Sequence, residues 1–560
     1  MSWVKKTKEN IYDMLTEAAL AAKANGDLNI ETVPDFVVEI PRDKTHGDFA
    51  ANIAMLLAKQ AKKAPRMIAE YIIKNLKTDG SYVESVEIAG AGFINFRLKE
   101  NWLADGLKDA LAQGGAYGNS DYGKGKKVQV EFVSANPTGE LHMGNARGAA
   151  IGDSLASVLD AAGYDVEREF YVNDAGNQIE KFGCSLEARY LQQLGVDAEF
   201  PEDGYHGEDI TRTMREFIDE VGDKYLNVDS EERKAEMVKY ALAKKLADIR
   251  SGLSRFGVEY DVWFSEQSLH DSGAVKDVVA ELEQKGQIEE KDGAKWFHAE
   301  RFGAEKPEVM VRANGVPTYY AADLAYHKNK FDRGFEKVIN IWGADHHGHV
   351  ARLKGAVEAI GYDPDKLDVI LMQLVRLFQG GEIVRMSKRS GKYVTLQELM
   401  DDVGVDASRF FFVMRSADSQ MDFDLDLAKS ESSDNPVYYV QYAHARICSI
   451  LQQAKEQGIE LPPLADVNME LLKDESEINL IKKILELPEE IVYCAVNQEP
   501  HRIASYALDM AGLFHSFYGR CRVLGVDADL QAARLYLCKA TAGCIAKALN
   551  LIGVKAPEHM

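Results

Sequence analysis

The sequence predicts a multidomain chain of α/β and α architecture: an α+β N-terminal unit, an α/β domain with an insertion, and an all-helical C-terminal unit. Three observations support this. The chain has 560 residues, enough for about three to five domains. A strand, a turn and a helix follow one another around residue 135, which is half of a βαβ unit. From Asn435 the apolar spacing is helical to the end.

We expect three units with boundaries at 1–118, 119–425 and 426–560, and an insertion in the middle unit at about 181–300.

The N-terminal unit alternates between helical and strand patterns. Its first helix is predicted from apolar residues that share one face, namely Val4, Ile11, Leu15 and Ala19. We expect a strand over 36–41, a helix over 50–61 and a strand with a glycine bend over 86–98. The glycine-rich stretch 113–127 indicates a domain boundary.

The α/β domain opens with a strand that ends in a turn. Val128, Val130 and Phe132 alternate with polar residues, and Asn-Pro-Thr-Gly follows. A helix is expected from about Met143 to Gly163, where glycine suits a C-terminal cap.

Strand patterns return later in the same domain, near Val338 and over 368–378, with a helical stretch over 350–360 between them. The segment 195–234 holds 13 acidic and 5 basic residues, which favours a solvated insertion between two halves of a sheet domain.

The C-terminal unit has a clear first helix. Asn435 suits the N-cap and Pro436 the first helical position. Apolar and half-polar residues then recur at spacings of three and four, at Val437, Val440, His444, Ile447 and Leu451.

The formal net charge of −23 disfavours nucleic acid as a partner when it is averaged over the chain. The local charge differs. Residues 376–397 hold five basic residues and one acidic residue, and 501–560 hold seven basic and four acidic. An acidic background with local basic surface suits selective rather than indiscriminate RNA binding.

The six cysteines form no CxxC pair, which disfavours a zinc ribbon or a redox motif. Their sparse placement fits a reducing cytoplasm. No stretch of 18 or more uncharged apolar residues occurs, so we expect no membrane span and a cytoplasmic protein.

The segment Ala135–Asn145, ANPTGELHMGN, is the strongest local motif. It joins the end of a strand to the start of a helix, where free N–H groups bind anions. Gly144 leaves room for a nucleotide, and His142 can donate a hydrogen bond to phosphate. The alternative is that His142 only caps the helix.

The second motif is Gly380–Leu396, GGEIVRMSKRSGKYVTL. Glycines bracket a cluster of basic residues, as expected for a mobile cationic loop that stabilises charge on a transferring phosphoryl or nucleotidyl group. The alternative is a solvated surface loop.

The two motifs together, HMGN and MSK, resemble the HIGH and KMSK signatures of the class I aminoacyl-tRNA synthetases. Further segments are similar to the arginyl-tRNA synthetase family: EFVSANPTGELHMGNARG, FYVNDAGNQI, PTYYAADLAYH, WGADHHGHV, NPVYYVQYAHAR, and HGDFAANIAMLLAK and GFINFRL near the N-terminus. The resemblance implies a Rossmann-like class I catalytic domain, an N-terminal domain that contacts tRNA, and a helical anticodon-binding domain.

The sequence departs from the signatures at two positions. Asn145 stands at the last position of HIGH, and Arg385 at the first position of KMSK. Arginine keeps the cation but lacks the point-charge geometry of lysine. We therefore place more catalytic weight on His142 and Lys388.

The resemblance implies a two-step reaction. ATP and L-arginine give arginyl-adenylate and pyrophosphate, and the arginyl group then passes to the 3′ end of tRNA(Arg). Mg²⁺ accompanies ATP, with no dedicated protein metal site and no tightly bound prosthetic group. A monomer is expected, and the family typically needs tRNA for the first step.

The resemblance also assigns site residues. The catalytic set is His142, Asn145, Ser387 and Lys388. The ATP-binding set is Ala135, Asn136, Pro137, Thr138, Gly139, His142, Gly144, Asn145, Met386, Ser387, Lys388 and Arg389. The arginine-binding set is Glu131, Asn136, Tyr319, Asp323, His346 and His347. The tRNA-binding set is Phe93, Asn95, Tyr442 and Arg446.

Asp323 is the natural acceptor for a guanidinium fork, which lysine could not match bidentately. Without the resemblance, Glu131 would be an ordinary strand charge, and Tyr319 and Phe93 would be core aromatics. The histidines of HHGH, His346, His347 and His349, could also form a metal site.

Three other functions are weighed against this one. A class I synthetase for another amino acid is disfavoured by Asp323 and the NDAGNQ segment. A non-catalytic tRNA-binding paralogue is disfavoured by His142, Ser387 and Lys388. A small-molecule adenylyltransferase would not need the long helical C-terminal unit.

Overall fold

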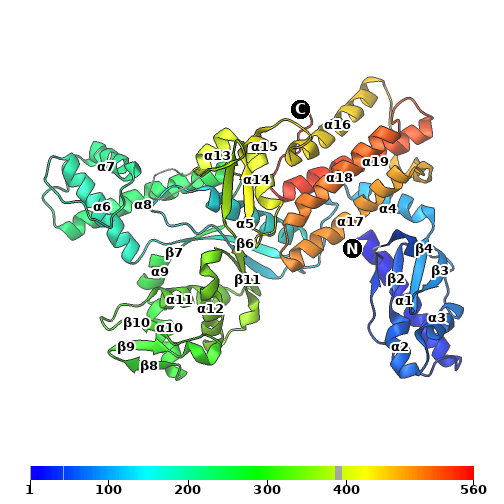
Figure 1. The fold of residues 1–560 in the computed structure, drawn as a ribbon, viewed down its shortest axis with the longest axis horizontal. Coiled ribbons are helices and arrows are strands. Elements are labelled where there is room, and N and C mark those ends of the chain that lie inside the picture. The colour runs from blue at the N-terminus through cyan, green and yellow to red at the C-terminus, as the bar shows by residue number, and fades with distance from the viewer. Residues whose placement is uncertain (1, 42, 385–393) are drawn as a thin grey trace.

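The computed structural model describes the whole chain except residues 1, 42 and 385–393 (Figure 1). In the view of Figure 1, helices α6, α7 and α8 extend to the left of the central sheet. The helical bundle lies at the upper right, with the N-terminal unit below it. Within the described residues, no helix combines the length and apolar character that crossing a bilayer requires.

The N-terminal unit packs helices on a four-stranded antiparallel sheet in the order β1-β2-β4-β3. Its elements are α1 (Trp3–Ala24), β1 (Val38–Glu39), β2 (Phe49–Ala51), α2 (Ile53–Ala61), α3 (Pro65–Lys74), β3 (Val83–Ala89), β4 (Phe93–Leu98) and α4 (Glu100–Gln113). The predicted face of α1 is confirmed, because Val4, Ile11, Leu15 and Ala19 are all buried.

Three predictions in this unit differ from the structure. The strand expected over 36–41 is reduced to the two residues of β1, and the expected helix begins later because β2 takes its first residues. The bent strand expected over 86–98 is a hairpin of β3 and β4. Gly90 and Gly92 have φ values of 52° and 133°, which turn the chain back on itself.

The central sheet is parallel, with five strands in the order β12-β11-β5-β6-β7. These strands are β5 (Lys127–Glu131), β6 (Asp165–Val172), β7 (Val262–Ser265), β11 (Lys337–Gly343) and β12 (Leu367–Met372). The chain runs outward from β5 to β7 and then returns to place β11 on the other side of β5. Ligands bind at the carboxyl ends of strands beside such a switch point.

The helices of this domain include α5 (Met143–Ala161), α11 (Tyr319–Asp332) and α12 (His347–Ala359). The expected helix after the first strand is confirmed as α5, which ends just before Gly163 at a φ of 88°. Buried Val158 and Leu159 are part of the apolar surface of α5.

Two excursions leave the parallel sheet. The first is a helical cluster with its own core, made of α6 (Asn177–Gln193), α7 (Glu208–Val221) and α8 (Ser230–Arg255). The second follows β7 and contains α9 (Glu266–Asp271), α10 (Ala274–Gln284), β8 (Ile288–Lys291), β9 (Ala294–Phe297) and β10 (Glu308–Val311). Because β7 lies within the range 181–300, the expected insertion is divided into two parts.

A separate three-stranded sheet follows the parallel one, in the order β14-β13-β15. It contains β13 (Val375–Gln379), β14 (Glu382–Val384) and β15 (Met421–Asp424). Helices α13 (Leu396–Asp402) and α14 (Val405–Val413) come between β14 and β15 in the chain, and α15 (Leu425–Lys429) follows β15. The single strand expected over 368–378 is therefore wrong. The chain leaves the parallel sheet at Leu374, which is 77% exposed, and enters a different sheet.

The C-terminal unit is a bundle of α16 (Pro436–Glu456), α17 (Glu475–Asn497), α18 (His501–Arg520) and α19 (Ala528–Leu551). The predicted start of α16 is confirmed, since the Asn435 side chain accepts a hydrogen bond from the Val437 N–H at 3.2 Å. The N-terminal unit packs against α17, and the Tyr117 hydroxyl donates to the Ile484 carbonyl at 2.9 Å.

Candidate active site

The turn before α5 is held by reciprocal hydrogen bonds. The Gly144 N–H donates to His142 Nδ1 at 3.1 Å, and the His142 N–H donates to Asn145 Oδ1 at 3.0 Å. A Cβ atom at Gly144 would lie 3.0 Å from the His142 ring, so glycine makes room for this cap. His142 does cap the helix, and both side chains are fixed where the helix N-terminus attracts anions.

The loop between β5 and this turn is strained. Val133 and Ser134 have φ values of 68° and 41°, in a region that residues other than glycine rarely occupy. Further along, Asn136 is exposed and Pro137 is buried, while Ala135, Thr138 and Gly139 are half-buried. The loop therefore presents backbone and small side chains beside the carboxyl end of β5.

The second motif meets the first. The Met143 N–H donates to the Val394 carbonyl at 3.2 Å, and the Leu396 N–H donates to the Leu141 carbonyl at 2.8 Å. Arg385, Met386, Ser387, Lys388 and Arg389 lie outside the described residues. The chain that follows them pairs with the backbone around His142, so Val394 to Leu396, at the end of the second motif, lie beside the first.

Tyr319 and Asp323 lie one turn apart at the start of α11. Tyr319 is exposed, and its hydroxyl accepts a hydrogen bond from Asn173 Nδ2 at 2.7 Å. The Asp323 side chain is 26% exposed, and its Oδ2 lies 2.5 Å from His349 Nε2. Burial alone would raise the pKa of Asp323. The hydrogen bond with His349 and the charge of Lys330 instead hold that pKa below its usual value.

The histidine that contacts Asp323 is His349, whereas we expected His346 and His347 in the arginine site. Its Nδ1 faces Arg352 at 3.3 Å, so its Nε2 is the atom that donates to Asp323. His346 and His347 are exposed at the start of α12, and His346 Nε2 lies 3.8 Å from Asp345 Oδ2. Among the described residues, no group of three or more His, Cys, Asp or Glu side chains is placed to hold a metal ion.

Glu266 is a site residue that the sequence interpretation missed. It follows β7 directly and is only 4% exposed, and its Oε2 has no hydrogen-bond partner. Burial, with added repulsion from Asp323 and Asp174, raises the pKa of Glu266 to about 7. A hydrogen bond with Tyr171 acts in the opposite direction but is outweighed. A carboxylate directly after a short apolar strand was the available signal, but the strand itself was assigned to the insertion.

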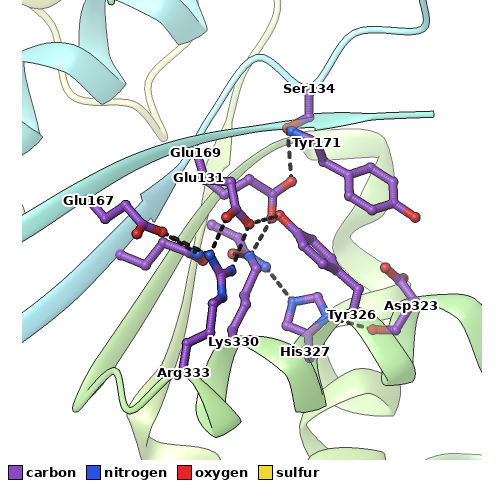
Figure 2. Close-up of polar contacts among 12 residues, drawn as sticks. Glu131, Ser134, Glu167, Glu169, Tyr171, Asp323, Tyr326, His327, Lys330 and Arg333 are labelled. Atoms are coloured by element: carbon purple, nitrogen blue, oxygen red, sulfur yellow. Dashed lines mark hydrogen bonds and ion pairs between the residues drawn. The ribbon is translucent and has the colours of Figure 1, made fainter. Parts of the chain in front are cut away.

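Glu131, at the end of β5, is buried and already paired. Its Oε2 lies 2.6 Å from Lys330 Nζ, and the Ser134 hydroxyl donates to its Oε1 at 2.9 Å (Figure 2). A carboxylate offers about four lone-pair sites, so these two partners leave acceptor capacity for a ligand.

Glu169, at the same level on β6, is fully buried. Arg333 donates to both of its oxygens at 2.7 and 3.1 Å, and the Tyr326 hydroxyl donates to Oε1 at 2.5 Å (Figure 2). Bidentate pairing satisfies a charge that would otherwise be costly to bury.

The residues expected to contact tRNA lie in two distant places. Phe93 is half-buried and Asn95 is only 7% exposed, because β4 is a central strand of the N-terminal sheet. On α16, Tyr442 is 43% exposed. Arg446 donates to the Tyr518 hydroxyl at 2.8 Å, and its guanidinium carbon lies 4.9 Å from the Tyr518 ring centroid.

Three features together define a class I aminoacyl-tRNA synthetase. They are a parallel sheet with a switch point, a capped turn that pairs with the chain following a cationic segment, and a helical bundle. Residues 106–423 match the family described as tRNA synthetases class I (R), catalytic domain. Residues 5–98 match the arginyl tRNA synthetase N terminal domain, and 440–560 match the DALR anticodon binding domain. The chain belongs to the arginyl-tRNA synthetase family.

Individual relatives support the same family assignment. An arginine–tRNA ligase of Moorella thermoacetica is 60% identical over 560 residues, with 100% of both chains covered. A putative arginyl-tRNA synthetase structure from Campylobacter jejuni matches 83% of this chain and 100% of its own, with 34% identity and a TM-score of 0.75. The Thermus thermophilus arginyl-tRNA synthetase, at 23% identity, 99% and 100% coverage and a TM-score of 0.75, shows the same fold.

Proposed function

We propose that the chain is an arginine–tRNA ligase. It activates L-arginine with ATP to form arginyl-adenylate and pyrophosphate, and then transfers the arginyl group to the 3′ end of tRNA(Arg), releasing AMP. The observation that carries this is the pair of neighbouring carboxylates, Asp323 and Glu266, at the carboxyl edge of the sheet whose strand β5 leads into the His142 turn. The 60% identical relatives favour neither another amino acid nor a non-catalytic paralogue.

The first step is an attack of the arginine carboxylate on the α-phosphorus of ATP, which expels pyrophosphate. No covalent bond to the protein is needed, so catalysis consists of positioning and electrostatic stabilisation. His142 and Asn145 bind phosphate and ribose oxygens at the N-terminus of α5. The loop residues Ala135, Asn136, Pro137, Thr138, Gly139 and the turn residue Gly144 surround the nucleotide.

The MSK segment acts on the pyrophosphate side. Lys388 is the main cation, with Met386, Ser387 and Arg389 in support. Mg²⁺ enters with ATP and neutralises phosphate charge, as it commonly does in nucleotide sites.

Arginine binding uses both ends of the substrate. Asp323 and Glu266 accept hydrogen bonds from the guanidinium, with Tyr319 beside them. Glu131 and Asn136 contact the α-amino end. His346 and His347, exposed at the start of α12, lie at the rim rather than on Asp323.

Glu266 makes arginine binding depend on pH. Its pKa of about 7 means that half of the free protein carries a neutral carboxyl at that pH. Binding a guanidinium requires the ionised form, so the affinity should rise by about 30-fold from pH 5.5 to a plateau above about pH 8. Calorimetric titration with arginine at several pH values measures this.

Glu266→Gln is the control for that titration. The amide keeps the shape of the side chain but does not titrate. We expect weaker binding that no longer changes with pH. The same slope in the variant and the wild type would assign the pH dependence to another group.

The tRNA spans both ends of the chain. Phe93, with Asn95 beside it in β4, contacts tRNA at the N-terminal unit, and Tyr442 and Arg446 contact the anticodon region on α16, where bases stack on aromatic rings. The units 1–118, 119–425 and 426–560 act as the tRNA-contacting, catalytic and anticodon-binding domains of a cytoplasmic monomer.

Charging of tRNA tests this function directly. With ATP, Mg²⁺ and labelled arginine, the protein should attach label to a tRNA(Arg) transcript but not to a transcript for another amino acid. Absence of label from both transcripts would contradict the proposed function.

A further inference from the structure

One face of α11 carries polar and aromatic side chains toward the carboxyl edge of the parallel sheet. They are spaced by four and three residues, which keeps them on one side of a helix: Tyr319, Asp323, Tyr326, Lys330 and the C-cap Arg333. Figure 2 shows Tyr326, Lys330 and Arg333 converging on Glu131 and Glu169. The helix therefore carries Asp323 near one end and its attachment to the sheet near the other.

Lys330 is the centre of that attachment. It is fully buried, and its Nζ lies 2.6 Å from Glu131 Oε2 and 2.9 Å from Asn340 Oδ1. The same nitrogen lies 4.3 Å from the centroid of the Tyr326 ring. An ammonium group has three donors, and each has a partner here. A buried charge with all its partners in place is held rigidly, because any displacement leaves a charge unpaired.

Asn340 on β11 links Lys330 to His327. Because its Oδ1 accepts from Lys330, its Nδ2 is the atom that faces His327 Nε2, at 2.7 Å. His327 Nε2 therefore accepts, and the Nδ1–H donates to the Asp323 carbonyl at 2.8 Å. Burial and the charge of Lys330 lower the pKa of His327 to about 4, so the ring stays neutral and keeps this tautomer at neutral pH.

These contacts form an unbroken path from Glu131 through Lys330, Asn340 and His327 to Asp323. In the proposed function, on which this inference rests, Glu131 contacts the α-amino end of arginine and Asp323 the guanidinium end. The path joins the Glu131 carboxylate to the backbone carbonyl of Asp323, and its inner members are buried.

We propose that Asn340 and His327 are positioning residues that fix the distance between the two ends of the arginine site, and thereby select the length of the substrate side chain. One acceptor is on the sheet and the other is on a helix packed against it. Without a rigid link, small sliding of α11 would let the pocket accept a guanidino acid that is one methylene shorter or longer. A hydrophobic pocket alone discriminates poorly by one methylene.

The test compares kcat/KM in tRNA charging for arginine and for its homologues with one methylene fewer and one more. Asn340→Asp keeps an acceptor for Lys330 but cannot donate to His327, and His327→Leu removes the ring. Each variant should reduce the preference for arginine over both homologues about tenfold, the size of one lost buried hydrogen bond. The double variant should lose no more than the larger single loss, because both act through one path.

Gln129→Leu is the matched control. Gln129 is a buried amide on β5, two residues before Glu131, and its Nε2 lies 3.4 Å from Glu167 Oε1, outside the path. It should leave the preference for arginine unchanged, because its hydrogen bond is with Glu167 rather than with a member of the path. Asn340→Ser, which adds no charge, is tested in parallel in case the additional carboxylate of Asn340→Asp prevents folding.

Folded variants in which all three substrates lose the same factor would overturn the positioning role, because a purely structural defect has that signature. A wild-type protein that charges tRNA with no guanidino acid would instead overturn the proposed function, and this inference with it. The two failures are therefore distinct.

Discussion

Asp323→Asn should lower kcat/KM for arginine about 10³-fold, because truncating one partner of a desolvated charge pair costs about 2–5 kcal/mol. The substitution keeps the volume and one oxygen of the side chain but removes the negative charge that faces the guanidinium. The hydrogen bond with His349 holds this carboxylate in its ionised form, so the wild-type pocket carries the charge at all working pH values. Steady-state charging kinetics with varied arginine measure the loss.

The control for this substitution lies on the same helix. Asp332→Asn removes a carboxylate that pairs with Lys328 at 3.1 Å on the outside of α11. Its kcat/KM should stay within about twofold of wild type, since exposed ion pairs contribute little. Equal losses in both variants would show that the helix, rather than the pocket, had been damaged.

Lys388→Ala should lower kcat about 10²-fold or more while leaving the binding of arginine nearly unchanged. A cation that reaches the pyrophosphate oxygens chiefly in the transition state stabilises that state selectively, and losing one such contact costs about 2.7–4 kcal/mol. Pre-steady-state formation of the adenylate separates this chemical step from transfer to tRNA.

Lys392→Ala is the comparison for Lys388→Ala. Both lysines belong to the same cationic segment, but Lys392 lies outside the MSK motif. If the two variants lost activity to the same extent, general positive charge rather than a particular contact would account for the motif. A wild-type kcat in Lys388→Ala would remove Lys388 from the mechanism.

Helices could be predicted from the sequence where the determinants are local. The faces of α1 and α16 follow from apolar spacing, and the start of α16 follows from Asn435 and its capping bond. Strands were harder, because a run of apolar residues does not show where one sheet ends. Leu374 separates two sheets within one such run, and β7 is only four residues long.

The residues of the active site could likewise be predicted only where they lie close together in the sequence. Tyr319 and Asp323 could be named because a short segment carries both, one turn apart. Glu266 and His349 reach Asp323 only through the packing of α9 and α12 against α11, and no local pattern encodes that. Lys330 and Glu131 are 199 residues apart, so their ion pair could not be read from either segment.

The most direct test of the account is arginine-dependent exchange of pyrophosphate into ATP, measured with and without tRNA. We expect exchange with arginine, at least when tRNA is present, and none with lysine or glutamine. Exchange with lysine or glutamine but not with arginine would contradict the assignment of Asp323 and Glu266 to the guanidinium. No exchange with any of the three under either condition would contradict the enzyme itself.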